Sequence, residues 1–165
     1  MRCSIEKMHI FPTNLSGHSE YMTQRHPIQN DQTTLVTIVT HDRERVFAHG
    51  PSARECIDTL YRVQQLHVFF IYSFVIMPDH CHVLLKVPSP ATMADTIGSF
   101  KRNVTMNLAR KVLWQSRYHA AYPRDPVEAL RYIHFNPVKA GLVDYPEDYP
   151  WSSACGRWDI TPLSF

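Results

Sequence analysis

Apolar and β-branched residues gather in segments that predict four strands and three helices. The run TTLVTIVT at residues 33–40 is rich in β-branched side chains and predicts a strand. Two denser apolar runs, Val68–Met77 and His80–Val87, are separated only by a Pro-Asp dipeptide, which predicts an antiparallel hairpin. A shorter stretch with three aromatic residues, Val112–Tyr122, predicts the fourth strand.

Three segments with apolar residues at three- or four-residue steps predict helices. The first covers roughly Ala53–Gln65, the second begins at Thr92, and the third begins with Pro126 at its first position and stops or kinks at the dipeptide Asn136-Pro137. The first six elements then match the split βαβ pattern of an α+β ferredoxin-like sandwich (βαββαβ), and the last helix is an addition. Its antiparallel sheet, with helices on one face, would leave the other face free for a ligand.

Length and composition predict a single soluble domain. A chain of 165 residues with 44% hydrophobic residues is large enough for a genuine core. Its longest apolar run reaches about half the length of a membrane-spanning helix, and no secretory signal is visible, so we expect a cytoplasmic, nucleoid-associated protein. Residues 1–30 show no clear period and are expected to form an irregular N-terminal extension. The four cysteines form no CxxC pair, which argues against a zinc ribbon.

The small net charge of +2 conceals a basic segment. Residues 101–139 hold 8 Lys/Arg against 2 Asp/Glu, or +6, whereas residues 1–100 and 140–165 sum to −1 and −3. This segment favours a partner that bears phosphate groups, although any single residue is also compatible with a solvated surface charge. The candidate DNA-binding residues are Lys101, Arg102, Arg110, Lys111, Arg117 and Arg131, joined by Arg124 and Lys139. Trp114, Tyr118 and Tyr122 fit either base stacking or the core.

Two histidines form a candidate metal site. His80 and His82 are two residues apart on a predicted strand, so their side chains share one face while Cys81 points to the other. Both imidazoles are then able to bind a single metal ion. Taken alone, an HxH pair on a strand is also compatible with a purely structural role.

A tyrosine and an asparagine form the second candidate group. Tyr132 and Asn136 are four residues apart on a predicted helix and therefore lie on one face. A tyrosine hydroxyl is a plausible nucleophile for a phosphate held by a metal, and the asparagine carbonyl oxygen is a plausible third ligand. The alternative is that Tyr132 packs in the core and its hydroxyl simply finds a hydrogen-bond partner.

Three segments, taken together, resemble the HUH single-tyrosine transposases of bacteria, and most closely the REP-associated tyrosine transposases. They are MPDHCHVLL at 77–85, WQSRYH at 114–119 and YIHFNPVKAGLV at 132–143, in that order and at similar separation. The segment VTIVTHDRERVF and the tail motif YPWSS fit the same pattern, so the resemblance covers roughly residues 33–153. Cys81 departs from it, because a bulkier aliphatic residue is more usual there.

The resemblance implies an activity and assigns the site residues. Members of this family cut single-stranded DNA near a hairpin with a divalent metal, Mg²⁺ or Mn²⁺, and one tyrosine. His80 and His82 match the metal-binding histidines, Tyr132 the nucleophile that leaves a 5'-phosphotyrosine, and Asn136 the third ligand. The catalytic domain would span residues 31–153 and a C-terminal tail residues 154–165. The general base is not identified; His119 and His134 are candidates, with structural or DNA-contacting roles as the alternative.

Three functions from different classes remain open at this stage. The first is a metal-dependent transposase that nicks and rejoins single-stranded DNA, and the second is a ferredoxin-like module that binds single-stranded DNA or RNA without cutting it. The third, a metal-dependent hydrolase of small molecules, is disfavoured because no carboxylate base is evident beside the histidines. The NPVKAGLV sequence is typical of the REP-associated branch and favours a monomer, with a homodimer that exchanges the tyrosine helix as the alternative.

Overall fold

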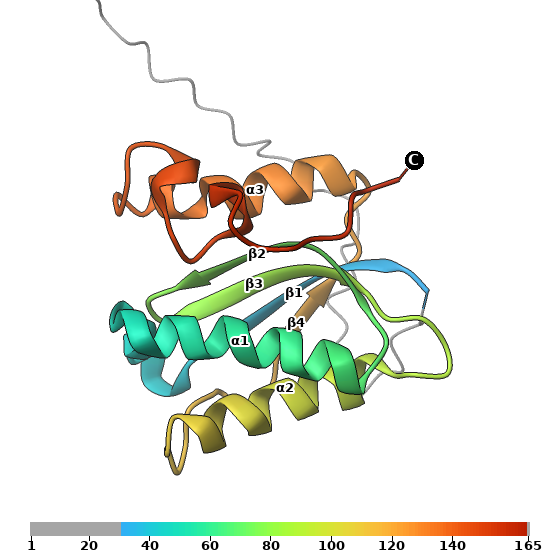
Figure 1. Cartoon of the computed structure of the whole chain (residues 1–165), viewed down its shortest axis with the longest axis horizontal. Coiled ribbons are helices and arrows are strands. Elements are labelled where there is room, and N and C mark those ends of the chain that lie inside the picture. Colours follow the sequence, from blue (N-terminus) through green and yellow to red (C-terminus); the bar gives the residue numbers. More distant parts are fainter. Residues whose placement is uncertain (1–30, 165) are drawn as a thin grey trace, which may run out of the picture.

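A computed structural model describes residues 31–164, so the expected extension at residues 1–30 lies outside the described residues. The described chain has the predicted order of elements. They are β1 (Thr33–Val39), α1 (Gly50–Leu66), β2 (Phe70–Met77), β3 (His80–Lys86), α2 (Met93–Asn107), β4 (His119–Ala121) and α3 (Pro126–Lys139). Figure 1 shows the sheet between α3 on one side and the pair α1 and α2 on the other.

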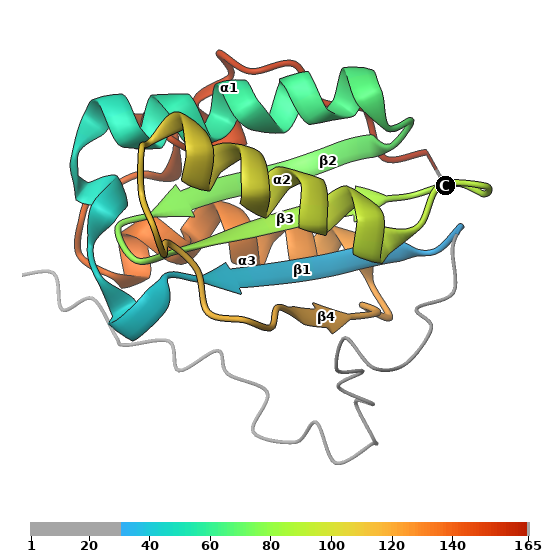
Figure 2. The same cartoon turned by 90° about the horizontal axis from the view of Figure 1, so that it is seen from below.

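The strands form one antiparallel sheet in the order β2-β3-β1-β4 (Figure 2). This order is that of a ferredoxin-like sandwich, so the predicted α+β class is confirmed. The β2-β3 hairpin turns at Pro78 and Asp79, with Met77 paired to His80, as the apolar runs predict. In the next pair, Thr37 of β1 lies opposite His82 of β3. One of the two central strands, β3, thus holds both predicted histidines.

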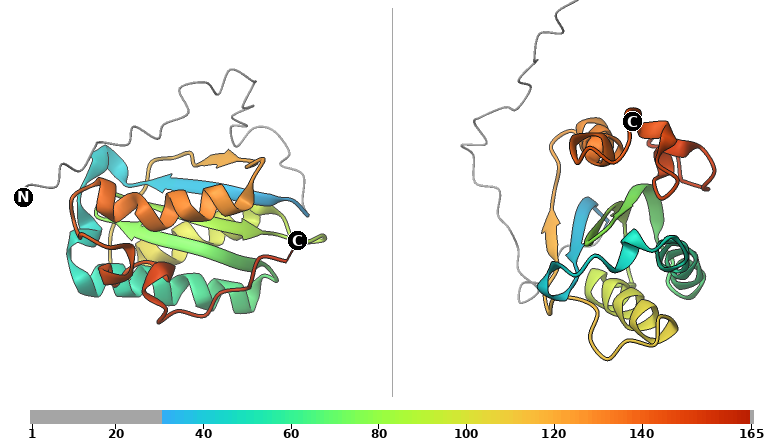
Figure 3. Two further views of the ribbon diagram at one scale, coloured as in Figure 1. Left: turned by 90° about the horizontal axis from the view of Figure 1, so that it is seen from above. Right: turned by 90° about the vertical axis from the view of Figure 1, so that its left-hand side faces the viewer.

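Two hydrophobic cores hold the layers together. The larger lies between the sheet and helices α1 and α2, and it includes Ile38, Cys56 and Phe100. The smaller lies under α3, where Ile133 packs with Val75 of β2 and its neighbours. The expectation that this second face is free is therefore wrong for the β2-β3 half, which α3 and the chain after it cover. Seen from that side, β4 lies at the edge of the sheet beside α3 (Figure 3, left).

The fourth strand covers only His119–Ala121, because the aromatic residues before it pack in the larger core. Trp114 and Tyr118 are 7% and 3% exposed and pack in the larger core, so they are not available for base stacking. The chain forms a bridge from Trp114 to Thr40, just past the end of β1, and the carbonyl groups of Gln115 and Ser116 then accept hydrogen bonds from the Lys101 ammonium. Strand pairing resumes only at residues 119–121.

Helix α3 continues past the Asn136-Pro137 dipeptide, which was expected to stop or kink it. It begins as predicted, with Pro126 at its first position and the Asp125 side chain capping the N-terminus. Pro137 lies inside the last turn, and the helix ends at Lys139. Gly141, at φ +69, then allows the amide of Leu142 to bond the carbonyl of Pro137, which satisfies that free carbonyl. The glycine, not the proline, marks the end.

The chain after α3 returns along the outer edge of β2. The amide of Ile76 donates to the carbonyl of Trp151, and the amide of Thr161 donates to the carbonyl of Ile71. These bonds cover an edge that would otherwise expose unpaired backbone groups. None of the helices in the described part of the chain combines the length and apolar character that crossing a membrane requires.

Replacing Ile133 should loosen α3 from the sheet. This side chain is 0% exposed in the smaller core, and Ile133→Ala removes buried methyl groups and leaves a cavity. We expect a loss of about 2–5 kcal/mol of unfolding free energy, measured by urea denaturation. Glu128→Gln, an exposed change on the same helix, should stay within about 0.5 kcal/mol of the parent. Equal stabilities of the two variants would contradict the packing role of α3.

Candidate active site

The two predicted histidines lie side by side at the start of β3. His80 follows the hairpin turn directly and His82 lies two residues on, so the alternation of the strand places both on the face that carries α3. Their ring centroids are 4.8 Å apart and the rings are nearly perpendicular. Cys81 points to the opposite face, where it is fully buried in the larger core.

Each histidine has one ring nitrogen held by a neighbour. His80 Nδ1 is 2.6 Å from a carboxylate oxygen of Asp79, and since an ionised carboxylate only accepts, Nδ1 carries the proton. His82 Nδ1 is 2.8 Å from the hydroxyl of Thr37, its partner across the β1-β3 pair. With its proton on Nδ1, His80 presents the lone pair of Nε2, and His82 does the same in the tautomer whose Nδ1 donates to the Thr37 hydroxyl. Such supporting bonds are typical of metal-binding histidines.

Asp79 is itself fixed by the loop after β1. Its backbone carbonyl accepts hydrogen bonds from both the amide and the hydroxyl of Thr40, and its other carboxylate oxygen lies 3.2 Å from Nη1 of Arg43. Partial burial raises the pKa of Asp79, but the hydrogen bonds and charges of His80 and Arg43 outweigh it and lower the pKa below its usual value. The carboxylate therefore stays ionised and orients His80.

His82 is kept in its neutral form by its surroundings. Its side chain is 6% exposed, and burial, with a smaller contribution from the charge of His80, lowers its pKa to about 3. A protonated imidazole cannot bind a metal ion, so this burial keeps the ring competent for binding at neutral pH.

Tyr132 completes the cluster from α3. Its ring centroid is 5.3 Å from that of His82, and its side chain is 41% exposed, so it borders both the histidines and solvent. Lys139, two turns further along α3, places its ammonium 5.3 Å from the Tyr132 ring centroid, within the range of a cation–π contact. Asn136 lies one turn beyond Tyr132 and is half-buried. The fold thus brings the predicted nucleophile to the predicted histidines.

The donor set fits a divalent metal with open coordination positions. Within residues 31–164, no group of three or more His, Cys, Asp and Glu side chains is placed to hold a metal ion. Two imidazole nitrogens, joined by the amide oxygen of Asn136, would leave further positions for water or phosphate, as catalytic rather than structural sites do.

The basic residues of the +6 segment do not form one patch around Tyr132. Four of them lie on or just after α2: Lys101, Arg102, Arg110 and Lys111. The sheet lies between α2 and α3, which carries Tyr132 (Figure 3, right). Lys101 bonds two backbone carbonyls, and Arg110 pairs with Glu44. The candidate DNA-binding residues of α2 therefore lie on the opposite side of the sheet from Tyr132. Arg117 is exposed just before β4, and Arg131 is exposed on α3 beside Tyr132.

The two candidate bases lie in different surroundings. His134 points to the C-terminal chain, where Nε2 is 3.1 Å from the hydroxyl of Ser153, and burial lowers its pKa. This placement gives it a structural role. His119 of β4 is exposed and pairs with Thr37, which in turn pairs with His82. His119 therefore stands on the active-site face of the sheet, two strands away from His82.

Three supporting residues escaped the sequence analysis. Thr37 was assigned only to a strand, and its bond to His82 depends on the β1-β3 register, which the sequence does not specify. Asp79 was assigned only to a turn, although an acidic residue directly before a candidate ligand is a recognisable signal. Arg43 lies far from the histidines in sequence, and no local pattern connects it to them.

The fold and the paired histidines with their facing tyrosine match the HUH single-tyrosine transposases of the insertion-sequence kind. The chain belongs to the IS200-like transposase family, whose model matches residues 29–134 and so includes His80, His82 and Tyr132. The identification made from the three sequence segments is therefore confirmed. Asn136 lies two residues beyond the matched range.

Individual relatives agree with this assignment. The chain is 30% identical over 135 residues to a Haemophilus influenzae protein assigned as a REP-associated tyrosine transposase, covering 71% of this chain and 76% of that protein. It is 29% identical over 98 residues to the REP-associated tyrosine transposase of Escherichia coli K12, covering 57% of this chain and 59% of that protein. Both relatives support a transposase similar to the REP-associated kind.

Two solved structures share the fold. One is a REP-associated tyrosine transposase bound to a REP hairpin, with a TM-score of 0.70, 23% identity, and coverage of 90% of this chain and 95% of that one. The other is a Deinococcus radiodurans protein assigned as a transposase, with a TM-score of 0.51, 16% identity, and coverage of 73% of this chain and 98% of that one. At these identities the likeness establishes the fold alone.

Removing the Asp79 carboxylate should weaken metal binding without unfolding the protein. Asp79→Ala deletes the acceptor that orients His80, and we expect the dissociation constant for Mn²⁺ to rise by about 10- to 100-fold in calorimetric titration. Asp79→Asn keeps an acceptor oxygen and should have a smaller effect. Asp58→Ala, which breaks an exposed pair with Arg54, serves as the control and should bind as the parent does.

Proposed function

We propose that this transposase cleaves and rejoins single-stranded DNA at hairpin-bearing sequences, through a 5'-phosphotyrosine on Tyr132 and with Mg²⁺ or Mn²⁺ as cofactor. The observation that carries the proposal is the cluster in which Tyr132 of α3 contacts His82 while His82 contacts His80. Tyr132 is 41% exposed, so a substrate can approach it from solvent.

The metal-binding residues would be His80, His82 and Asn136. A divalent ion there supplies a positive charge that polarises the scissile phosphate and offsets the charge that develops in the transition state. Asp79 and Thr37 hold the two rings, so little rearrangement is needed when the site is loaded. His82 remains neutral because it is buried.

Tyr132 would carry the covalent step. Its hydroxyl loses a proton and its oxygen attacks the phosphorus, while the bond from phosphorus to the 3' oxygen breaks and that oxygen leaves as a 3'-hydroxyl after taking a proton. One phosphoester bond replaces another, so a second 3'-hydroxyl rejoins the strand by the reverse step without ATP. Since a free phenol has a pKa near 10, the hydroxyl must be activated within the site. Lys139, beside the ring, is a cation that would favour the ionised oxygen and the phosphate that approaches it.

A hairpin-bearing single strand is the partner that the relatives support. A REP hairpin is bound to a protein that shares this fold along most of its length. With a single domain and no separate DNA-binding module among the described residues, the catalytic domain would have to recognise the hairpin itself. A monomer remains our expectation, since α3 and its tyrosine lie against the histidines of their own chain.

Metal removal provides the first test. Labelled single strands from the genome of origin, each able to form a hairpin, are incubated with the protein and Mn²⁺ or Mg²⁺. We expect site-specific nicking that EDTA abolishes, while retention of the hairpin in a gel-shift assay with EDTA survives. Hairpin binding with no nicking in either metal would instead favour the non-cutting module.

A further inference from the structure

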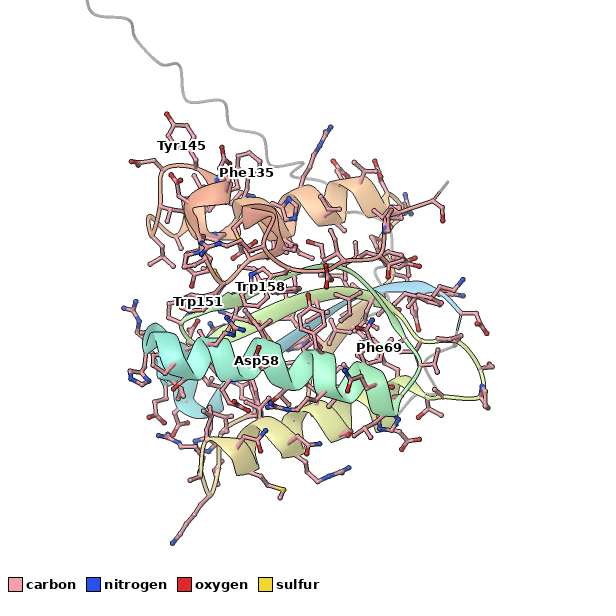
Figure 4. The ribbon with its side chains drawn as sticks, in the orientation of Figure 1. Asp58, Phe69, Phe135, Tyr145, Trp151 and Trp158 are labelled. Atoms are coloured by element: carbon pink, nitrogen blue, oxygen red, sulfur yellow. The ribbon has the colours of Figure 1, made fainter. Side chains whose placement is uncertain are left out.

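Two aromatic side chains stand exposed near the end of α3. Phe135 is 48% exposed and Tyr145 is 63% exposed. In Figure 4 both project from the α3 side of the molecule away from the sheet, while Trp151 and Trp158 lie between the layers. Residues 126–139 of α3 also contact the 3-10 turn Pro146–Asp148 that follows Tyr145. A group of exposed apolar side chains on one surface, unlike a single one, marks a candidate binding site.

Two cations flank Phe135 on the same helical face. Arg131 and Lys139 lie four residues before and four residues after it, so the three side chains form a stripe along α3. We call Arg131, Phe135, Lys139 and Tyr145 the aromatic stripe. Acidic side chains limit it at each end, with Glu128 one turn before Arg131 and with Asp144 and Glu147 next to Tyr145. The positively charged surface is therefore short, and it matches the length of only a few nucleotides.

The stripe adjoins the candidate nucleophile. Tyr132 precedes Phe135 by less than one turn, and the ammonium of Lys139 contacts the Tyr132 ring. A phosphate held by Lys139 would therefore lie next to the phenol. On the other flank of the helix, Tyr132 faces His82. A DNA strand that lies along the stripe would therefore run next to Tyr132 and the histidines.

We propose that the aromatic stripe binds the unpaired nucleotides next to the cleavage point, with bases stacked on Phe135 and Tyr145 and backbone phosphates near Arg131 and Lys139. Aromatic platforms between cations are the usual means of holding single strands without reading every base. A second copy of this chain is the other conceivable occupant. A stable protein interface needs about 20–30 residues a side, and four partly exposed side chains fall far short of that. The inference rests on the proposed function, because it takes single-stranded DNA as the substrate.

The test separates stacking from charge. A fluorescein-labelled oligothymidylate of about 12 nucleotides and an abasic oligomer of equal length are titrated with Tyr132→Phe protein in EDTA, and anisotropy is recorded. We expect Phe135→Ala and Tyr145→Ala each to weaken oligothymidylate binding by about 5- to 100-fold and to leave abasic binding unchanged. Tyr145→Phe should bind as the parent does. Arg131→Ala and Lys139→Ala should weaken both oligomers alike.

Leu66→Ala is the matched control, because Leu66 is an exposed apolar side chain, 73% accessible, at the end of α1. Unchanged oligothymidylate binding in both aromatic variants would overturn the inference, as would a parent protein that binds no better to oligothymidylate than to the abasic oligomer. So would sedimentation in which Phe135→Ala converts a dimer to a monomer without affecting DNA binding. Since no variant in this assay can cleave, failure of the proposed cleavage would leave these outcomes intact.

Discussion

Tyr132→Phe is expected to abolish both nicking and the covalent protein–DNA adduct, to below the limit of detection. The change removes only the hydroxyl that would form the phosphotyrosine bond, while the ring that contacts His82 and Lys139 stays in place. Because the side chain is 41% exposed, we expect the free energy of unfolding to change by no more than about 0.5 kcal/mol. Denaturing gels of protein with labelled hairpin DNA and Mn²⁺ measure the adduct directly.

Tyr145→Phe is the matched control for this experiment. It removes the same hydroxyl from another exposed tyrosine in the chain segment after α3, and it should form adduct as the parent does. An adduct of undiminished yield in Tyr132→Phe would show that a different side chain, or water, is the nucleophile. Hairpin binding by Tyr132→Phe should persist, since within residues 31–164 the contacts of Tyr132 are made by its ring.

His82→Ala should cause the second large loss. It removes a buried imidazole that contacts both His80 and Tyr132, and it leaves the Thr37 hydroxyl without its partner. We expect the dissociation constant for Mn²⁺ to rise by at least about 100-fold and nicking to be lost. Loss of a residue that only supports a metal ligand typically raises this constant by about 10- to 100-fold. Isothermal titration calorimetry of the purified protein measures the metal affinity independently of activity.

His49→Ala controls for the removal of an imidazole elsewhere. His49 is exposed before α1 and bonds only Ser52 among the side-chain contacts of the described residues. It should bind Mn²⁺ as the parent does. Because His82→Ala removes a buried side chain, some loss of stability is expected, so the fold of this variant is checked by circular dichroism. A folded variant with unchanged Mn²⁺ affinity would place the metal elsewhere.

The order of elements was predictable because each depends on local patterning. The apolar runs on either side of Pro78 and Asp79 are enough to predict the hairpin and to place His80 and His82 on one face. The ends of elements were less predictable, because they depend on distant partners. Residues 112–118 have strand-like composition, but Trp114 and Tyr118 are taken by the core, and Lys101 satisfies the carbonyls that a strand partner would otherwise bond.

The residues of the site also fall into those that the sequence predicts and those that depend on tertiary structure. Motif spacing was enough to propose His80, His82 and Tyr132, and the fold brings them into contact. The supporting bonds of Thr37 and Arg43 depend on strand register and on a loop that approaches from β1, which one sequence does not determine. The charge of a sequence segment was the weakest guide. Residues of α2 and α3 add to the same +6, yet the sheet lies between them.

Mass spectrometry of the trapped adduct tests the central claim most directly. Trypsin cuts after Arg131 and after Lys139, so Tyr132 is the only tyrosine in the peptide YIHFNPVK. After reaction with hairpin DNA and Mn²⁺, then nuclease trimming, the account predicts this peptide with the added mass of a 5'-linked nucleotide on Tyr132. An adduct on any other peptide, or nicked DNA with no protein attached, would contradict it.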